Sequence, residues 1–168
     1  IIELKHLVAV AHQIVSPQAS RPVIGLIQDS LLGCQEMSKP TVHICRQDAV
    51  DILARVPHAP VRDVPLDGIS GRDLLSLFLP PDLNYTKGDV VIRRGRLIEG
   101  TFAKAHMGVA VNSIIHVIWL DYGPEAAERF IDSVQFAVNL WMTGQGMSVG
   151  LSDTIADIGT MLKMDEIV

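Results

Sequence analysis

Residues 123–146 read GPEAAERFIDSVQFAVNLWMTGQG, and this stretch organises the elements on either side of it. Gly123 and Pro124 end one helix and begin the next, because glycine is frequent just after a helix and proline at its first position. Apolar side chains then recur every three or four residues: Ala127, Phe130, Ile131, Val134, Ala137, Val138 and Trp141. The spacing predicts a long amphipathic helix that buries this face and closes at Gly144 and Gly146.

Shorter elements are predicted around this helix from periodicity, capping residues and proline stops. The expected helices cover residues 3–14, 29 onward with Asp29 as the cap, 47–56, 70 onward with Ser70 to Asp73 as a capping box, 111–122, and 153 or 154 onward. Two β-rich runs, Val90–Ile92 and Leu97–Ile98, flank Arg94–Gly95 and predict a β-hairpin. The sequence therefore predicts an α+β fold of mixed helices, a β-hairpin and short strands.

The composition is that of a globular chain with its own core. Of 168 residues, 48% are hydrophobic and 20% are charged, so no disulfide or metal is needed to hold the fold. The net charge is −5 and the 14 Lys and Arg residues are scattered, which argues against an autonomous nucleic-acid-binding protein. No apolar run approaches the roughly 18 residues that span a bilayer, so no membrane association is expected.

Local motifs give weak support to chemistry within the chain itself. Cys34, His43 and Cys45 match no common zinc pattern, and we expect two half-buried free thiols in a reducing compartment. Residues 146–150, GMSVG, have the G-x-S-x-G form of a hydrolase elbow, but no histidine follows to complete the usual order. His116 lies in an apolar helix and is expected to be a hydrogen-bonded core residue. An unrelated small α+β hydrolase that uses the Ser148 or Asp153 region remains an alternative.

A series of blocks in a fixed order is more informative than any single motif. Residues 13–18 read QIVSPQ, Pro22 follows, and residues 25–31 read GLIQDSL. This stretch resembles the QIVSPQ…KP…GIVQDTL segment in the largest subunit of eukaryotic-type RNA polymerase II, which is homologous to bacterial β′. Further blocks resemble the same family in the same order: SGRDLLS at 70–76, the glycines and lysine at 95, 100, 104 and 108, IHV at 115–117, GP at 123–124, NLW at 139–141 and SVGLSDTIAD at 148–157.

Two loops depart from the family pattern. A tryptophan-containing insert of the family is shortened to the loop over residues 57–69, and the loop over residues 80–87 is also short. These departures indicate a divergent homologue, of a protist or of a large DNA virus.

The resemblance implies that residues 1–150 form the pore domain of the polymerase and that residues 151–168 begin the funnel helices. The pore is the passage through which nucleoside triphosphates (NTPs) enter and backtracked RNA 3′ ends leave. The chain begins at Ile1 without an initiator methionine or a signal peptide, so we expect a module excised from a larger multidomain subunit. The family's catalytic aspartates, in an NADFDGD loop, are absent. We therefore expect Mg²⁺ in the full enzyme, but neither bound Mg²⁺ nor activity in this chain alone.

The resemblance also implies partners, location and candidate residues. The expected partners are other polymerase subunits, the rest of the largest subunit, template DNA, transcript RNA and NTPs, and the expected location is the nucleus, or a virion or the cytoplasm for a viral protein. The candidate substrate-channel residues are Arg21, Gln28, Asp29, Arg72 and Lys104. For Arg21, Arg72 and Lys104 the alternatives are phosphate contact or an ordinary structural charge, and for Gln28 and Asp29 a structural role is favoured. A purely structural interaction module of the polymerase remains a second alternative.

Overall fold

The computed structural model describes residues 1–60, 63–148, 150–157 and 159–160. In chain order the described elements are α1 Ile2–His6, α2 Val10–Gln13, β1 Val15–Ser16, β2 Arg21–Pro22, α3 Gln28–Met37, β3 His43–Ile44, α4 Arg46–Arg55, β4 Ile69–Ser70, α5 Gly71–Ser76, β5 Tyr85–Lys87, β6 Val90–Arg93, β7 Arg96–Glu99, α6 Lys104–Met107, α7 Ile114–Tyr122, α8 Pro124–Gln145 and the 3-10 helix η1 Leu151–Thr154. The predicted α+β class is confirmed. The sheets have only two or three short strands each, and most of the regular structure is helical.

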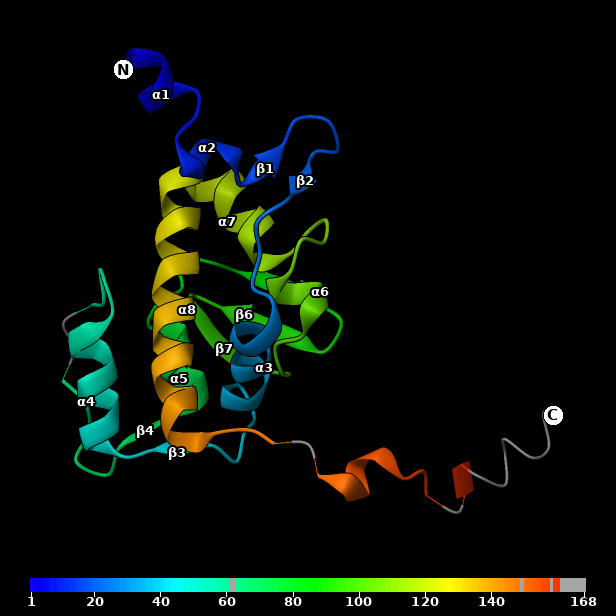
Figure 1. Cartoon of the computed structure of the whole chain (residues 1–168). Coiled ribbons are helices and arrows are strands. Elements are labelled where there is room, and N and C mark those ends of the chain that lie inside the picture. Colours follow the sequence, from blue (N-terminus) through cyan, green and yellow to red (C-terminus); the bar gives the residue numbers. More distant parts are fainter. Residues whose placement is uncertain (61–62, 149, 158, 161–168) are drawn as a thin grey trace.

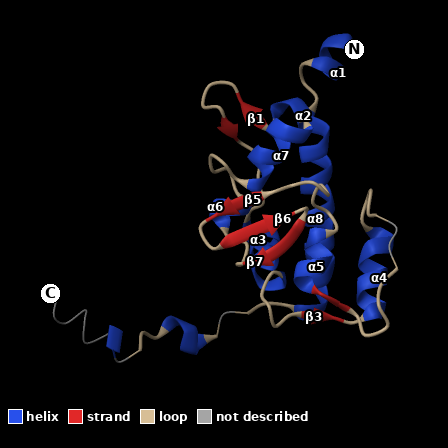
Figure 2. Cartoon of the chain, turned by 180° about the vertical axis from the view of Figure 1, so that it is seen from behind, coloured by secondary structure: helices blue, strands red, loops and turns tan. Residues whose placement is uncertain are grey.

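Helix α8 is the central element, as the sequence predicts. It runs through the body with α7, α3 and α2 packed along it and α4 on the opposite side from α6 (Figures 1 and 2). Six of the seven predicted apolar positions are buried, from Ala127 to Val138, and Trp141 is half-buried against the core. A turn at Gly123, with φ +92°, separates α7 from α8 and lets the two helices pack against each other.

Gly33 sets the close approach of α3 to α8. A Cβ atom at this position would overlap the Val138 side chain and lie 2.8 Å from Cγ of Met142. The absence of a side chain therefore lets α3 lie directly on the apolar face of α8.

The largest sheet lies beside α3 and α5, with strand order β5-β6-β7 and antiparallel pairing throughout. The β6–β7 hairpin is the predicted one, whereas β5 was not predicted. Ser70 caps α5 as expected, because its Oγ accepts the N–H of Asp73 at 3.1 Å. Ser76 then joins α5 to the sheet, accepting the N–H of Leu97 at 3.0 Å.

Two further sheets of two short strands hold the remaining loops. Strands β1 and β2 pair around the residue 17–20 turn, and β3 pairs with β4 so that the loop before α5 is closed. Cys45 caps the adjacent helix α4 by accepting the N–H of Asp48 at its Sγ.

Several local predictions were wrong. The expected helix over residues 3–14 is two short helices, α1 and α2, and α1 has no buried residue. Asp29 does not cap α3, since the cap position is Ile27 and no side chain makes the capping bond. The cysteines are not both half-buried: Cys34 is fully buried and Cys45 is exposed.

The chain leaves the body after α8 (Figure 1). At the expected helix start the structure has the short 3-10 helix η1, and residues 161–168 and the side chain of Asp153 lie outside the described residues. Among the described helices, none combines the length and the apolar character needed to cross a lipid bilayer.

Candidate functional site at the amino-terminal end of α3

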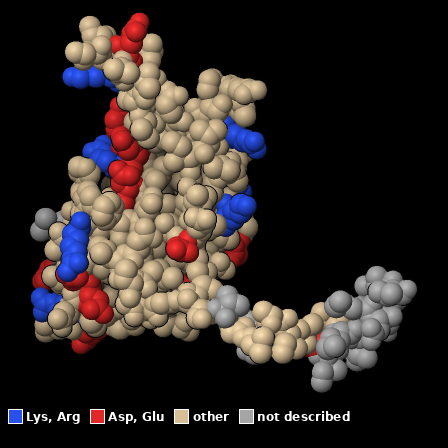
Figure 3. Space-filling model, viewed as in Figure 1, with Lys and Arg blue, Asp and Glu red and all other residues tan. Residues whose placement is uncertain are grey.

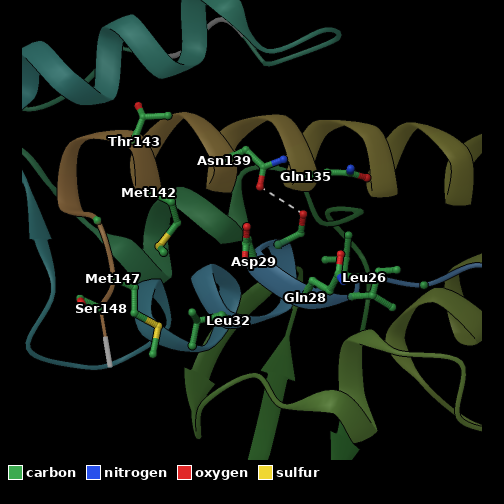
Figure 4. Close-up of a pocket in the computed structure, with 14 residues that line it drawn as sticks. Leu26, Gln28, Asp29, Leu32, Gln135, Asn139, Met142, Thr143, Met147 and Ser148 are labelled. Atoms are coloured by element: carbon green, nitrogen blue, oxygen red, sulfur yellow. Dashed lines mark hydrogen bonds between the residues drawn. The ribbon is translucent and has the colours of Figure 1, made fainter. Parts of the chain in front are cut away.

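A hollow of about 740 Å³ lies between the start of α3, the carboxy-terminal half of α8 and residues 146–148. Figure 4 shows Asp29 and Leu32 rising from α3 and Met142 pointing down from α8. Two of the five predicted channel residues, Gln28 and Asp29, line this hollow. We refer to it below as the α3–α8 hollow.

The segment that leads into α3 is held in place by backbone contacts. The N–H of Leu26 donates to the carbonyl oxygen of Met107 at 2.9 Å. A Cβ atom on Gly25 would lie 2.9 Å from the carbonyl carbon of Gly108, so this crossing requires the glycine. The family-like blocks at residues 25–31 and 104–108 therefore meet in space, where the segment that leads to Gln28 crosses the end of α6.

Gln28 itself has a strained backbone. Its φ of +50° lies in the left-handed region, which costs a residue with a side chain about 1 kcal/mol. The strain occurs where an extended segment turns abruptly into α3, and it fixes the direction in which the side chains of Gln28 and Asp29 leave the chain. No hydrogen bond joins either side chain to the loop at residues 16–22 among the described residues.

Helix α8 contributes polar residues that the sequence did not single out as site residues. Gln135, Asn139 and Thr143 lie four residues apart and all line the hollow. Oγ of Ser30 donates to Oδ1 of Asn139 at 3.1 Å, which links the two helices across the floor (Figure 4). The four-residue spacing of these polar residues was a usable signal, but only the folded chain shows that Asn139 reaches Ser30 at the start of α3.

The charge of the hollow is inconsistent with a phosphate site. Among its described lining residues Asp29 is the one charged side chain, and no Lys or Arg accompanies it. A polyphosphate in this place would face the carboxylate of Asp29 with no cation of the lining beside it. The hollow is better suited to amide, hydroxyl or cationic groups.

Arg72 lies at the other end of α3 and has a different environment. Its Nε donates to the carbonyl oxygen of Ser38 at 2.8 Å, and its Nη2 donates to the carbonyl oxygen of Gly100 at 2.9 Å. Since α3 has ten residues, this point is about 15 Å from Gln28 along the helix. The guanidinium therefore joins α5 to the end of α3 and to the residue that follows β7. These contacts favour the structural role for Arg72 over contact with a phosphate.

Arg21 and Lys104 are exposed and carry no ion pair among the described side chains. Arg21 lies in β2 and Lys104 at the first residue of α6, and the two elements lie on the same side of α8 as α3 (Figures 1 and 2). Figure 3 shows separate basic groups rather than a continuous basic stripe on the coloured part of the face in view. The structure thus brings Arg21, Gln28, Asp29 and Lys104 to one side of the molecule, whereas Arg72 is half-buried between α5, the end of α3 and the residues at and after the end of β7.

The hydrolase alternative finds little geometric support. Ser148 lies in an irregular segment after α8, and no histidine is among the described residues that line the hollow beside it. His116 is buried, and its Nδ1 accepts the N–H of Asn112 at 3.1 Å, as expected for a core histidine. Among the residues that the structure describes, no three His, Cys, Asp or Glu side chains are grouped so as to hold a metal ion.

Comparisons with a family model and with curated proteins both identify the same family. Residues 13–154 match the family described as RNA polymerase Rpb1, domain 3. Two curated relatives from Trypanosoma brucei brucei, DNA-directed RNA polymerase II subunits RPB1-A and RPB1-B, are each 30% identical to this chain over 181 residues. These alignments cover 99% of this chain and 10% of each relative, so the chain spans about a tenth of their length.

Proposed function

This chain belongs to the Rpb1 domain 3 family of RNA polymerase largest subunits, and from that premise we propose that it forms the wall of the polymerase pore. In this role it lines the passage through which NTPs reach the active centre of DNA-directed RNA polymerase and into which the RNA 3′ end moves on backtracking. The observation that carries the proposal is the meeting of the family-like blocks around Gly25 and Gly108, which leaves Gln28, Asp29 and Lys104 exposed along one side.

The exposed residues on this side have separable roles in the proposal. Lys104 and Arg21 carry charges without ion pairs in the described chain, so each can meet a phosphate group of a passing NTP or RNA. Gln28 and Asp29 border the α3–α8 hollow, whose charge suits a base or sugar edge better than a phosphate. Arg72 acts through the fold, since its donors are directed at backbone carbonyls.

The chemistry of nucleotidyl transfer is assigned to parts of the polymerase outside this chain. In the full enzyme, bound Mg²⁺ would supply the activation of the RNA 3′-OH and the stabilisation of charge on the triphosphate. The described residues do not fit such a site, because no suitable cluster of carboxylates is present among them. The role proposed for this chain is the passage and positioning of nucleotides.

The proposed boundaries follow the shape of the chain. Residues 1–150 form the pore domain, and residues 151–168 begin the funnel helices. The departure of the chain from the body after α8 supports this division (Figure 1). The rest of the largest subunit and other polymerase subunits are the proposed partners, with DNA and RNA in the full complex and the nucleus as its location.

A structural interaction module is the second candidate, and one observation favours it. The large apolar side chains within residues 1–10 are exposed, from 92% for Ile1 to 59% for Val8. Such a surface is expected to be covered in an assembly. In this alternative the domain packs against neighbouring segments but does not touch nucleotides.

Charge reversal at Lys104 separates the two candidates. In a polymerase assembled with the full-length subunit, Lys104→Glu is expected to slow elongation or alter backtracking, because a carboxylate would repel phosphates in the passage. Arg55→Glu, on α4 at the other side of α8, is the matched control and should leave both unchanged. Equal elongation rates and pausing for Lys104→Glu and the unmodified enzyme would favour the interaction module.

A further inference from the structure

A second hollow, of about 730 Å³, lies between the loop before β4, helix α5 and the β6–β7 turn. We call it the α5 hollow. Its walls include Val64, Pro65, Leu77, Leu79 and Pro81, so most of its surface is apolar. Both segments that depart from the family pattern contribute described residues to its lining: residues 60, 63–65 and 68–69 from the first and Pro81 from the second.

The acidic residues of the α5 hollow already have partners. Oδ1 of Asp73 accepts from Nη2 of Arg96 at 2.9 Å and its Oδ2 accepts from the Ser70 hydroxyl at 2.7 Å. Burial alone raises the pKa of Asp73, but these bonds outweigh burial and lower it, so the carboxylate stays ionised. Asp63 pairs with Arg46 at 3.6 Å.

Arg94 is the lining cation without an ion pair among the described side chains. It occupies the first central position of a two-residue turn between Arg93 and Arg96, with φ +48° at Arg94 and +67° at Gly95. Asparagine or glycine is preferred at such a position, and arginine there costs about 1 kcal/mol. Arg94, exposed and without an ion pair in the described chain, is thus held at the edge of the hollow by a turn that does not favour it.

The turn is held rigidly. The N–H of Arg94 donates to Oδ1 of Asn84 at 3.2 Å, and the N–H of Gly95 donates to the carbonyl oxygen of Leu83 at 2.9 Å. A Cβ atom on Gly95 would overlap the carbonyl oxygen of Pro80. The position of the Arg94 backbone is therefore set before any ligand arrives, which reduces the entropy lost on binding.

These features select one class of ligand. Nucleic acid is disfavoured, because the described lining has no aromatic side chain for base stacking and only one unpaired cation for phosphates. Apolar walls beside a single guanidinium fit a carboxylate flanked by apolar side chains. We propose that the α5 hollow is a docking site for a polypeptide segment of a partner protein that presents an Asp or Glu between apolar residues to Arg94.

The test uses the full 168-residue chain, labelled with ¹⁵N, and two pentapeptides. Acetyl-Ala-Leu-Glu-Leu-Ala-amide and its Gln counterpart are titrated while the amide shifts of Ser70, Leu77 and Gly95 are followed by NMR. The Glu peptide is expected to bind about tenfold more tightly or better, since a charge-assisted hydrogen bond to guanidinium is lost with Gln.

Two variants assign the effect to Arg94. Arg94→Asn should abolish the preference for Glu while keeping or raising the melting temperature, because asparagine tolerates the left-handed turn. Arg93→Gln removes the same charge from a neighbour that does not line the hollow, and should keep the preference. The proposal is overturned by equal or absent binding of the two peptides, by an equal loss in both variants, or by tighter binding of hexauridylate RNA at the same amides.

Discussion

The guanidinium of Arg72 lies where three backbone carbonyls from two separate segments converge. It reaches Ser38 at the end of α3, Gly100 after β7 and, at 3.5 Å, Ile98 within β7. The three carbonyls belong to residues that are separated from Arg72 by 34, 28 and 26 positions in the chain. The guanidinium therefore supplies these backbone oxygens with hydrogen-bond donors from a distant part of the sequence. A charge in a family-like motif is therefore understood here as part of the fold.

Arg72→Lys tests this account because it keeps the charge and removes the planar fork. We expect the free energy of unfolding to fall by about 1–3 kcal/mol, since charged hydrogen bonds to partly buried carbonyls are lost. Arg21→Lys is the matched control at an exposed site and should change stability by less than about 0.5 kcal/mol. Urea unfolding measures both. A neutral effect of Arg72→Lys would show that the positive charge, rather than its geometry, is what matters at this position.

The two thiols also differ at the residue scale. Burial raises the pKa of the Cys34 thiol, whereas Cys45 is exposed at the start of α4. In the native chain a thiol reagent such as DTNB should label Cys45 readily and Cys34 only on unfolding, because thiolate and access are both required. Mass spectrometry of the labelled peptides measures this. Labelling of both thiols at equal rates in the native state would contradict the packing of α3.

At the scale of elements, the contact of α3 with α8 depends on a single missing side chain. Gly33→Ala is expected to lower the free energy of unfolding by about 1–3 kcal/mol, because the new methyl group would overlap Val138. Gly144 lies in α8 with no other atom near its Cβ position, so it provides the control. Gly144→Ala should raise the free energy of unfolding by up to about 1 kcal/mol through helix propensity. Thermal or urea unfolding of the pair gives the comparison. Stabilisation by both substitutions would mean that α3 does not approach α8 so closely.

The elements that the sequence predicts best are those with strong local signals. The stripe of α8 and the Ser70 cap of α5 depend on residues within a few positions of each other. The helix expected over residues 3–14 fails because periodicity alone does not supply a surface to pack against, and Leu4 and Leu7 remain exposed. Strand β5 was missed because Tyr85–Lys87 is too short to show alternation and is defined by its pairing with β6.

The candidate site was predictable only in part, because some of its residues come together through tertiary contacts. Gln28 and Asp29 were identified through the resemblance, whereas Asn139 contributes through a bond to Ser30 over 109 positions of sequence. The sequence identifies Arg94 as part of a hairpin turn. It does not show that Arg94 lacks an ion pair, because this follows from the pairing of the nearby carboxylates with Arg96 and Arg46 in the folded chain. Such partnerships are tertiary and have no local signature.

At the scale of the whole molecule, the domain has two distinct sides. One side carries β2, the start of α3 and α6, with the exposed residues assigned to the pore, and α4 lies across α8 from it (Figures 1 and 2). None of the residues assigned to the pore (Arg21, Gln28, Asp29 and Lys104) lines the α5 hollow. Docking of a partner in this hollow and passage of nucleotides along the pore side are therefore proposed as independent properties. The relatives' much greater length supplies the remaining walls in the proposed assembly.

Photo-cross-linking of the RNA 3′ end tests the pore assignment most directly. A benzophenone amino acid replaces either Lys104 or Arg55 in a polymerase assembled with the full-length subunit, and complexes with 3′-labelled RNA are irradiated before and after backtracking. Label is expected to attach at position 104 mainly in backtracked complexes and not at position 55. Absence of label at position 104 in complexes that transcript cleavage shows to be backtracked, or equal label at both positions, would contradict the pore assignment.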